Sequence, residues 1–216
     1  MNKEYIMKSV KWMKSASFVL AALVASANLS AQNALEILKK SDDVVYAPKD
    51  QHSVNKIIVT DKNGNEKEMI AEFLQKGRDK RLVRFTAPAS QAGIAFLSLP
   101  QDVMYLYLPA YKKERRIASH VKNQAFAGTD FSYNDMEAKP LNEKYDPRLL
   151  SQTADSFVLE LLPKAGITSE HSKIVLTISK TTYYSTIVEY YDLGGNKAKE
   201  LINSDIQKSC NQDYVA

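Results

Sequence analysis

Alternation of apolar and polar residues, broken by turn residues at short intervals, is the feature of this sequence that most constrains its fold. The alternation begins at Ser53, and turn residues follow about every 8 to 12 positions, as in antiparallel β proteins. A period of two places successive side chains on opposite faces of a strand. We therefore predict a mainly β fold with about ten strands, over residues 54–60, 67–76, 81–86, 94–99, 103–108, 115–119, 157–162, 173–179, 186–192 and 197–203.

Turn residues support this division into strands. Residues 63–65 (Asn-Gly-Asn) and 193–196 (Leu-Gly-Gly-Asn) are predicted hairpin turns, because glycine and asparagine accept the positive φ that such turns need. Prolines end strands without interrupting a ladder, and six of them are predicted to lie between strands: Pro88, Pro100, Pro109, Pro140, Pro147 and Pro163.

Two segments depart from the alternation. Residues 34–40 space their apolar side chains like one face of a short amphipathic helix, which we expect to end at residues 41–43 (Ser-Asp-Asp). Residues 121–152 lack sustained alternation and contain a glycine and two prolines, so we predict a long excursion with short helical turns. Long excursions in compact domains are often functional.

The first 31 residues have the layout of a secretory signal peptide. Lysines up to Lys14 precede an apolar run over residues 16–25, and small residues at 29–31 or 25–27 suit cleavage. A membrane anchor is the weaker interpretation, because the run is shorter than the roughly 20 apolar residues that cross a bilayer. We expect cleavage of residues 1–31, export from the cytoplasm and no integral span in the mature chain.

Charge and cysteine content narrow the class of partner. Removing the four lysines and one glutamate of residues 1–31 from totals of 29 basic and 25 acidic residues leaves a net charge of +1, which argues against nucleic acid. Residues 32–216 suffice for one domain with a substantial core. Cys210 is the single cysteine, so we expect no intrachain disulfide, and it stands too far from the leader to receive an N-terminal lipid. A soluble product is predicted.

Catalytic and metal-binding signatures are scarce. The histidines His52, His120 and His171 are far apart in sequence and do not form a zinc-binding spacing, so no metal and no cofactor are predicted. Asp130 and Asp135 flank an aromatic pair and are conceivable as an acid/base pair, with His120 as a further candidate. Capping of short turns by the two aspartates is the favoured interpretation, and an enzyme remains the minority hypothesis.

Several strands are apolar on both faces. In residues 81–86, Val83 and Phe85 alternate with Leu82, Arg84 and Thr86, whereas residues 94–99 are apolar throughout. Strands of this kind need cover on both sides. One face can pack on the helix and the excursion while the other lines a groove for an apolar ligand, although an ordinary core is favoured by composition alone.

Three ordered blocks carry a resemblance to a known family. The blocks are LVRFTAPASQAGIAFLSL, MYLYLPAYKKERRIAS and FAGTDFSYNDM, within a match that spans about residues 34–203. Together they resemble the outer-membrane lipoprotein-sorting protein family, the LolA-like periplasmic carriers. The resemblance implies a curved antiparallel sheet that forms an incomplete (half) β-barrel with a helical plug, and an apolar cavity that binds acyl chains without catalysis.

The resemblance also suggests site residues. Those expected to line or cover a lipid-binding cavity are Phe85, Phe96, Leu97, Leu99, Met104, Leu106, Phe126, Phe131 and Tyr133. Arg115 and Arg116 match an arginine pair of the family. One of them is expected to meet a lipid head group, or both to pair with Asp130 or Asp135, which is the favoured alternative.

This chain differs from the family at its C-terminal end. Family members continue with a tryptophan-proline block and further strands, whereas here QKSCNQDYVA follows and the sole tryptophan is Trp12, so shortening at the C-terminus is predicted.

The favoured function is a periplasmic carrier that receives a lipid or lipoprotein from an inner-membrane transporter and delivers it towards the outer membrane. The alternative is an envelope interaction or sensor module of the same fold that binds a protein partner and carries no lipid.

Overall fold

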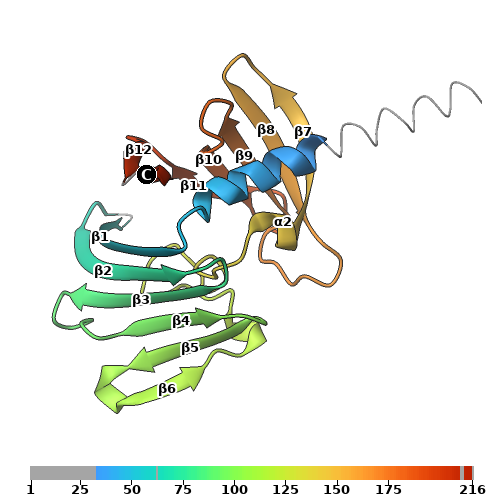
Figure 1. The fold of residues 1–216 in the computed structure, drawn as a ribbon. Helices are drawn as coiled ribbons and strands as arrows, with labels where there is room; N and C mark the ends of the chain where they lie inside the picture. Colours follow the sequence, from blue (N-terminus) through green and yellow to red (C-terminus); the bar gives the residue numbers. More distant parts are fainter. Residues whose placement is uncertain (1–32, 62, 210–211, 216) are drawn as a thin grey trace, which may run out of the picture.

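Two antiparallel sheets dominate the computed structural model, which describes residues 33–61, 63–209 and 212–215 (Figure 1). The predicted signal peptide with both cleavage positions, Trp12 and Cys210 lie outside the described residues. The prediction of a mainly β fold with an unclosed barrel is confirmed. Its wall consists of two separate sheets rather than one continuous sheet.

The first sheet is a six-stranded meander in which spatial order follows chain order. Each strand pairs antiparallel with the next, and short turns suffice for such neighbours. The strands are β1 (Asp50–Thr60), β2 (Glu66–Lys76), β3 (Lys80–Ala87), β4 (Ala95–Leu99), β5 (Val103–Leu108) and β6 (Lys113–Arg116).

The second sheet has five strands in the order β11-β10-β9-β8-β7, and a two-stranded sheet follows it. The five strands are β7 (Tyr145–Gln152), β8 (Ser156–Pro163), β9 (Lys173–Ser179), β10 (Ser185–Tyr191) and β11 (Lys197–Ile202). The two-stranded sheet pairs β12 (Gln207–Ser209) with β13 (Gln212–Val215).

The predicted excursion over residues 121–152 is wrong at its C-terminal end. Strand β7 begins at residue 145, so the excursion ends at residue 144. Pro147 lies inside β7 and not between strands. β7 pairs with β8 alone, so it is an edge strand, and an edge strand tolerates a residue without a backbone N–H. The strand was missed because Pro147 indicated a strand end, although an edge strand accepts a proline.

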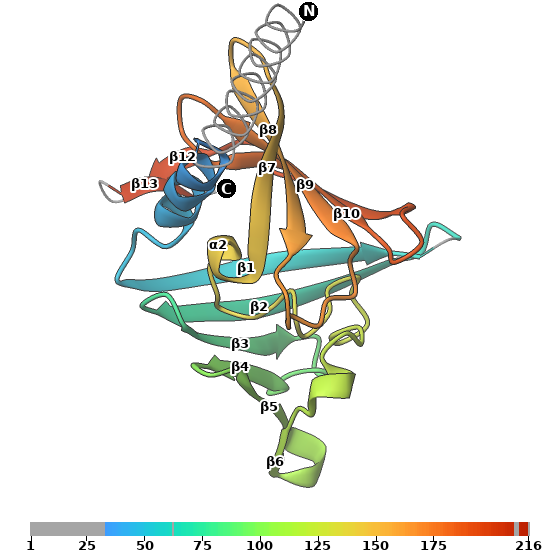
Figure 2. The same ribbon diagram turned by 90° about the vertical axis from the view of Figure 1, so that its right-hand side faces the viewer.

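The N-terminal helix, residues 33–45, is longer than predicted. Its buried residues follow the spacing of one helix face: Ala34, Ile37, Leu38, Ser41 and Asp42. The polar residues 41–43 do not end the helix, because the Asp42 carboxylate accepts hydrogen bonds from the backbone N–H groups of Leu141 (3.0 Å) and Asn142 (2.9 Å). It thereby caps α2 (Leu141–Lys144), which lies at the junction of the two sheets (Figures 1 and 2).

Both predicted hairpin turns are present and share one local design. Asp61 Oδ1 accepts hydrogen bonds from the backbone N–H groups of Asn63 and Asn65, and Gly64 has a φ of 82°. Asp192 Oδ1 likewise accepts a hydrogen bond from the Asn196 N–H, and Gly195 also has a φ of 82°. An aspartate at the end of the strand thus organises each turn, and glycine supplies the left-handed backbone.

Each sheet has its own hydrophobic cluster. The five-stranded sheet packs Leu159, Leu161 and Leu176 against Ile37 and Leu38 of the N-terminal helix, which crosses that face of the sheet (Figure 1). The inner face of the six-stranded sheet is covered instead by the irregular segment 121–140. That second cluster contains Met69, Ala71, Val83, Phe85, Phe96, Met104, Ile117, Phe126 and Met136.

β1 and β11 are edge strands, and they approach each other where the barrel remains open. Residues 57–60 of β1 and 199–201 of β11 line one small hollow together with residues 129–131. Within the described residues no ladder joins the two strands. Figure 2 shows β1 running along the top of its sheet towards the strands of the second sheet.

Candidate functional site

A cavity of about 690 Å³ lies between the inner face of β1–β3 and segment 121–140. Ligand sites for small molecules typically span roughly 300 to 1,000 Å³ and are mostly apolar. The cavity is lined by Val54, Asn55, Lys56, Ile57, Phe73, Arg81, Val83, Phe85, Phe126, Thr129, Phe131, Asp135 and Met136.

Alternation along the strands explains the apolar wall. Phe73 on β2 pairs in register with Val83 on β3, and Phe85 follows two residues later on the same face. Phe126 of segment 121–140 closes over them, with its ring centroid 5.5 Å from that of Phe85. Phe96 and Tyr133 complete an aromatic cluster, each within 6 Å of Phe126 between centroids. The four rings form one packed cluster beside the cavity.

The rim of the cavity exposes one aromatic side chain to solvent. Phe131 of segment 121–140 lines the cavity and is 37% exposed. Val54 on the edge strand β1 is 62% exposed, but it is in register with Glu72, so its side chain lies on the outer face of the sheet. An exposed apolar group at the mouth of an apolar cavity is typical of a binding site.

Arg81 brings a positive charge to the cavity wall without an acidic partner. Its guanidinium donates to Gln75 Oε1 from Nε (3.2 Å) and Nη2 (2.7 Å), and to the Met136 carbonyl oxygen at 3.5 Å. Among the described residues no ion pair involves Arg81. Arg84, three positions along β3 on the outer face, is by contrast paired with Glu72.

The structure separates the predicted cavity residues into three groups. Phe85, Phe126 and Phe131 line the cavity. Buried or packed behind that wall are Phe96, Met104, Leu106 and Tyr133. Leu97 and Leu99 alternate with the buried Phe96 and Ser98 along β4 and therefore lie on the opposite face of the sheet.

The predicted pairing of Arg115 or Arg116 with an aspartate is not formed. Both arginines are exposed on β6, at the far edge of the first sheet from the cavity, and Arg115 lies over the Tyr111 ring at 5.7 Å. Asp135 pairs with Lys199 of β11 instead. Asp130 is exposed and has no ion pair among the described residues. The arginines fail to reach the aspartates because the second sheet, not β6, borders Asp135.

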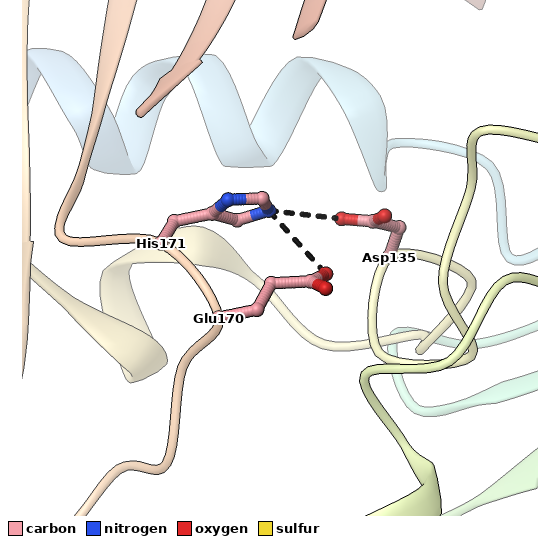
Figure 3. Close-up of side chains that lie close together, drawn as sticks. All are labelled: Asp135, Glu170 and His171. Carbon is pink, nitrogen blue, oxygen red and sulfur yellow. Dashed lines mark ion pairs between the residues drawn. The ribbon is translucent and has the colours of Figure 1, made fainter. Parts of the chain in front are cut away.

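A polar cluster adjoins the cavity at Asp135. It consists of Asp135, Glu170, His171 and Lys199, which come from segment 121–140, the β8–β9 loop and β11. His171 Nε2 faces Glu170 Oε1 at 3.4 Å and Asp135 Oδ1 at 3.8 Å, as Figure 3 shows. Lys199 Nζ bonds the other Asp135 oxygen, Oδ2, to which Ser132 donates from its backbone N–H (2.8 Å) and hydroxyl (3.0 Å).

Neighbouring charges in this cluster shift the pKa values of Asp135, Glu170 and His171 in the direction opposite to that of burial. Burial alone would raise the pKa of Asp135, but the neighbouring His171 and the bound Lys199 hold that pKa well below its usual range. Burial would lower the pKa of His171, yet the two carboxylates raise it. The pKa of Glu170 is lowered, since His171 and Ser132 outweigh its desolvation. Burial raises the pKa of the neighbouring Tyr190.

Sequence reasoning missed most of this cluster. The turn-capping role expected of Asp135 is present, because its carboxylate accepts the Ser132 N–H. The histidine beside it is His171 and not His120, which lies exposed in the short 3₁₀ segment η2 (Ser119–Val121). No sequence motif pointed to Glu170 or Lys199 as neighbours of Asp135. Lys199, for example, is 64 positions from Asp135 in the chain.

Comparisons with known proteins place this geometry in a family. A family model described as "-like: Uncharacterized protein" matches residues 77–216. A "putative outer membrane lipoprotein-sorting protein domain" from Vibrio parahaemolyticus is 29% identical, with 86% of this chain and 83% of that chain covered and a TM-score of 0.74. The chain belongs to the LolA-like family.

Other solved structures share the fold of this LolA-like chain. A DUF1329 family protein from Desulfovibrio piger is 25% identical, with coverage of 85% of this chain and 82% of that chain and a TM-score of 0.74. A LolA superfamily protein from Nitrosomonas europaea is 21% identical, with coverage of 83% and 81% and a TM-score of 0.68. No match is found among curated proteins. In the part of the chain that the structure describes, no helix combines the length and apolarity of a membrane span.

Proposed function

We propose that this LolA-like protein is a non-catalytic periplasmic carrier that binds acyl chains of a lipid or lipoprotein in its cavity and moves them towards the outer membrane. The observation that supports this most is the cavity lined by Phe85 and Phe126, with the exposed Phe131 at its rim. An acyl chain in water costs about 0.8 kcal/mol per CH₂, so a carrier must offer a comparable apolar surface. An inner-membrane transporter is the proposed source of the cargo.

Arg81 is the proposed contact for an acidic head group. Its present partners, Gln75 Oε1 and the Met136 carbonyl, are neutral, so its charge remains available to a carboxylate or phosphate. The head group would then lie at the polar part of the wall and the chain against Phe85 and Phe126.

Lipid content of the protein tests the proposal directly. The full chain is expressed in a secreting bacterial host, purified without detergent and analysed by native mass spectrometry and lipid extraction. We expect co-purifying lipid and saturable uptake of a fluorescent fatty acid. A folded protein that arrives without lipid and takes up no probe would overturn the carrier and favour the interaction module.

A matched pair of variants locates the binding site. Phe131→Asp places a charge at the cavity rim, and Leu150→Asp places one on the edge strand β7, where the exposed fraction is 46%. Both sites are exposed, so both variants should fold. We expect Phe131→Asp to weaken probe binding about tenfold, because an ionised group at the mouth must lose water as the chain enters. Equal binding by the two variants would place the lipid elsewhere.

The head-group contact has its own control on the same strand. Arg81→Met should weaken binding of a fatty acid about ten- to hundredfold, the range of a hydrogen bond to a charged group, while leaving a fatty alcohol of equal length unaffected. Arg84→Met removes an arginine from the outer face of β3 and should change neither. Equal losses for acid and alcohol would assign Arg81 a structural role only.

A further inference from the structure

We propose that Asp135, Glu170 and His171 form a binding site for a divalent transition-metal ion at the wall of the cavity. Each residue offers one ligand atom, and the three atoms all lie within 4.8 Å of one another (Figure 3). One imidazole nitrogen with carboxylate oxygens is a ligand set used by zinc and related ions. This inference does not depend on the proposed carrier function.

The separations suit four-coordinate zinc. Zinc ligands of this type lie about 2.0 to 2.2 Å from the metal, which places neighbouring ligand atoms of a tetrahedron about 3.3 to 3.6 Å apart. His171 Nε2 and Glu170 Oε1 are already 3.4 Å apart, and His171 Nε2 and Asp135 Oδ1 are 3.8 Å apart. The three ligand atoms lie within 4.8 Å of one another, so side-chain rotation of the carboxylates would have to complete the tetrahedral spacing.

Unsatisfied buried groups point into this space. His171 is only 7% exposed, and neither of its ring nitrogens has a hydrogen-bond partner. Glu170 Oε1 is also buried without a hydrogen bond. A proton on Nε2 would lie along a single direction in the ring plane, whereas two carboxylate oxygens flank that nitrogen. A metal ion bonds all three atoms at once and removes the penalty of burying His171 Nε2 and Glu170 Oε1 unpaired.

The surroundings hold the ligands as metal sites require. Asp135 Oδ2 is anchored by Ser132 and Lys199, which leaves Oδ1 facing His171. The Tyr190 ring packs against the imidazole with 4.9 Å between centroids and fixes its plane. Supporting contacts of this kind orient ligands and are part of the design of metal sites.

Charge and access both permit a cation. Lys199 offsets one of the two carboxylates, so the cluster with a neutral imidazole keeps one negative charge. The lysine bonds Oδ2 and therefore leaves the Oδ1 side to the metal. Asp135 also lines the cavity, which gives the ion and a fourth ligand, water, a route from solvent.

Zinc titration of the purified full chain tests the site. After treatment with a chelator and its removal, we expect calorimetry to show one equivalent of Zn²⁺ bound and native mass spectrometry to show one added zinc. Zinc should also raise the thermal unfolding temperature. The absence of saturable binding by the folded protein would overturn the proposal.

Matched variants separate this site from surface binding. His171→Gln should weaken zinc binding at least tenfold, the usual consequence of losing one ligand or its support. His120→Gln removes an exposed histidine and should bind as the wild type does. If His171→Gln fails to fold by circular dichroism, Glu170→Gln serves, with Glu143→Gln as its control. Wild-type affinity in a folded ligand variant would show adventitious binding and sink the assignment. Fatty-acid uptake measured on the same samples tests the carrier separately.

Discussion

The two halves of the molecule cover their sheets in different ways, and the 690 Å³ cavity lies in only one of them. The five-stranded sheet lies under a regular helix whose apolar stripe supplies Ala34, Ile37 and Leu38. The six-stranded sheet lies under segment 121–140, which contributes Phe126 and Met136 but no continuous stripe.

The difference teaches how an apolar cavity is kept open in a folded protein. A helix face repeats every three to four residues and interdigitates with a sheet at close-packed density. An irregular segment must satisfy its own backbone polar groups, as Thr129 does by donating its hydroxyl to the Phe126 carbonyl, and its apolar side chains cover the sheet only in part. The cavity therefore follows from the type of cover rather than from the sheet.

The largest expected effect lies in the half that the helix covers. Leu38 is fully buried, and Leu38→Ala should lower the free energy of unfolding by about 3.5 kcal/mol, because the methyl groups are lost and a cavity remains. Chemical denaturation measures the change. Leu35→Ala, on the half-buried side of the same helix, should cost less than half as much. Similar losses for both would show that the helix does not seal this core.

The junction between the halves should respond almost as strongly. Lys144 of α2 binds Glu137 Oε2 at 2.9 Å and Asn134 Oδ1 at 3.1 Å, and both charged side chains are at most 10% exposed. Lys144→Met leaves Glu137 buried without its cation, so we expect a loss of about 3 kcal/mol in denaturant unfolding.

Lys139→Met is the control for that junction. Lys139 pairs with Asp102, whose side chain is 54% exposed, and such pairs contribute about 0 to 1 kcal/mol. If the two variants lost equal stability, the buried pair would not be what holds segment 121–140 against α2.

The smallest expected effect on stability lies in the half with the cavity. Phe73 is half-buried on the inner face of β2 and already borders the cavity. Phe73→Ala should therefore cost only about 1.5 kcal/mol, below the range for a fully buried phenylalanine, because part of its surface has no neighbour to lose. Thermal and chemical unfolding measure this. A loss as large as that of Leu38→Ala would mean that the cavity is filled in solution.

Local patterns predicted the strands well because strand formation here depends on neighbours in sequence. Val83 and Phe85 alternate with polar residues, and both are buried on one face as expected. β7 was missed because Pro147 reads as a terminator unless the strand is known to be an edge. The separation into two sheets was not predictable, since it depends on β6 and β7 remaining unpaired across the long segment between them.

The candidate site was predictable only in its aromatic part. Phe85, Phe126 and Phe131 follow from apolar blocks and from the family resemblance, whereas Glu170 and His171 lie in a loop with no motif. The second sheet places these two residues next to Asp135, and the spacing of residues in the sequence does not predict this contact. The same tertiary arrangement places Lys199 next to Asp135, so the aspartate forms its ion pair with Lys199 and not with Arg115 or Arg116.

Between β1 and β11 the barrel wall is interrupted, and residues 129–131 lie where ladder hydrogen bonds would otherwise run. Each ladder hydrogen bond that must break adds about 1 kcal/mol to the cost of opening, and here none has to break among the described strands. Under the proposed carrier function, cargo that enters between β1 and β11 would not have to break a β ladder among the described strands. The cost of opening this side would then depend on side-chain contacts and not on backbone pairing.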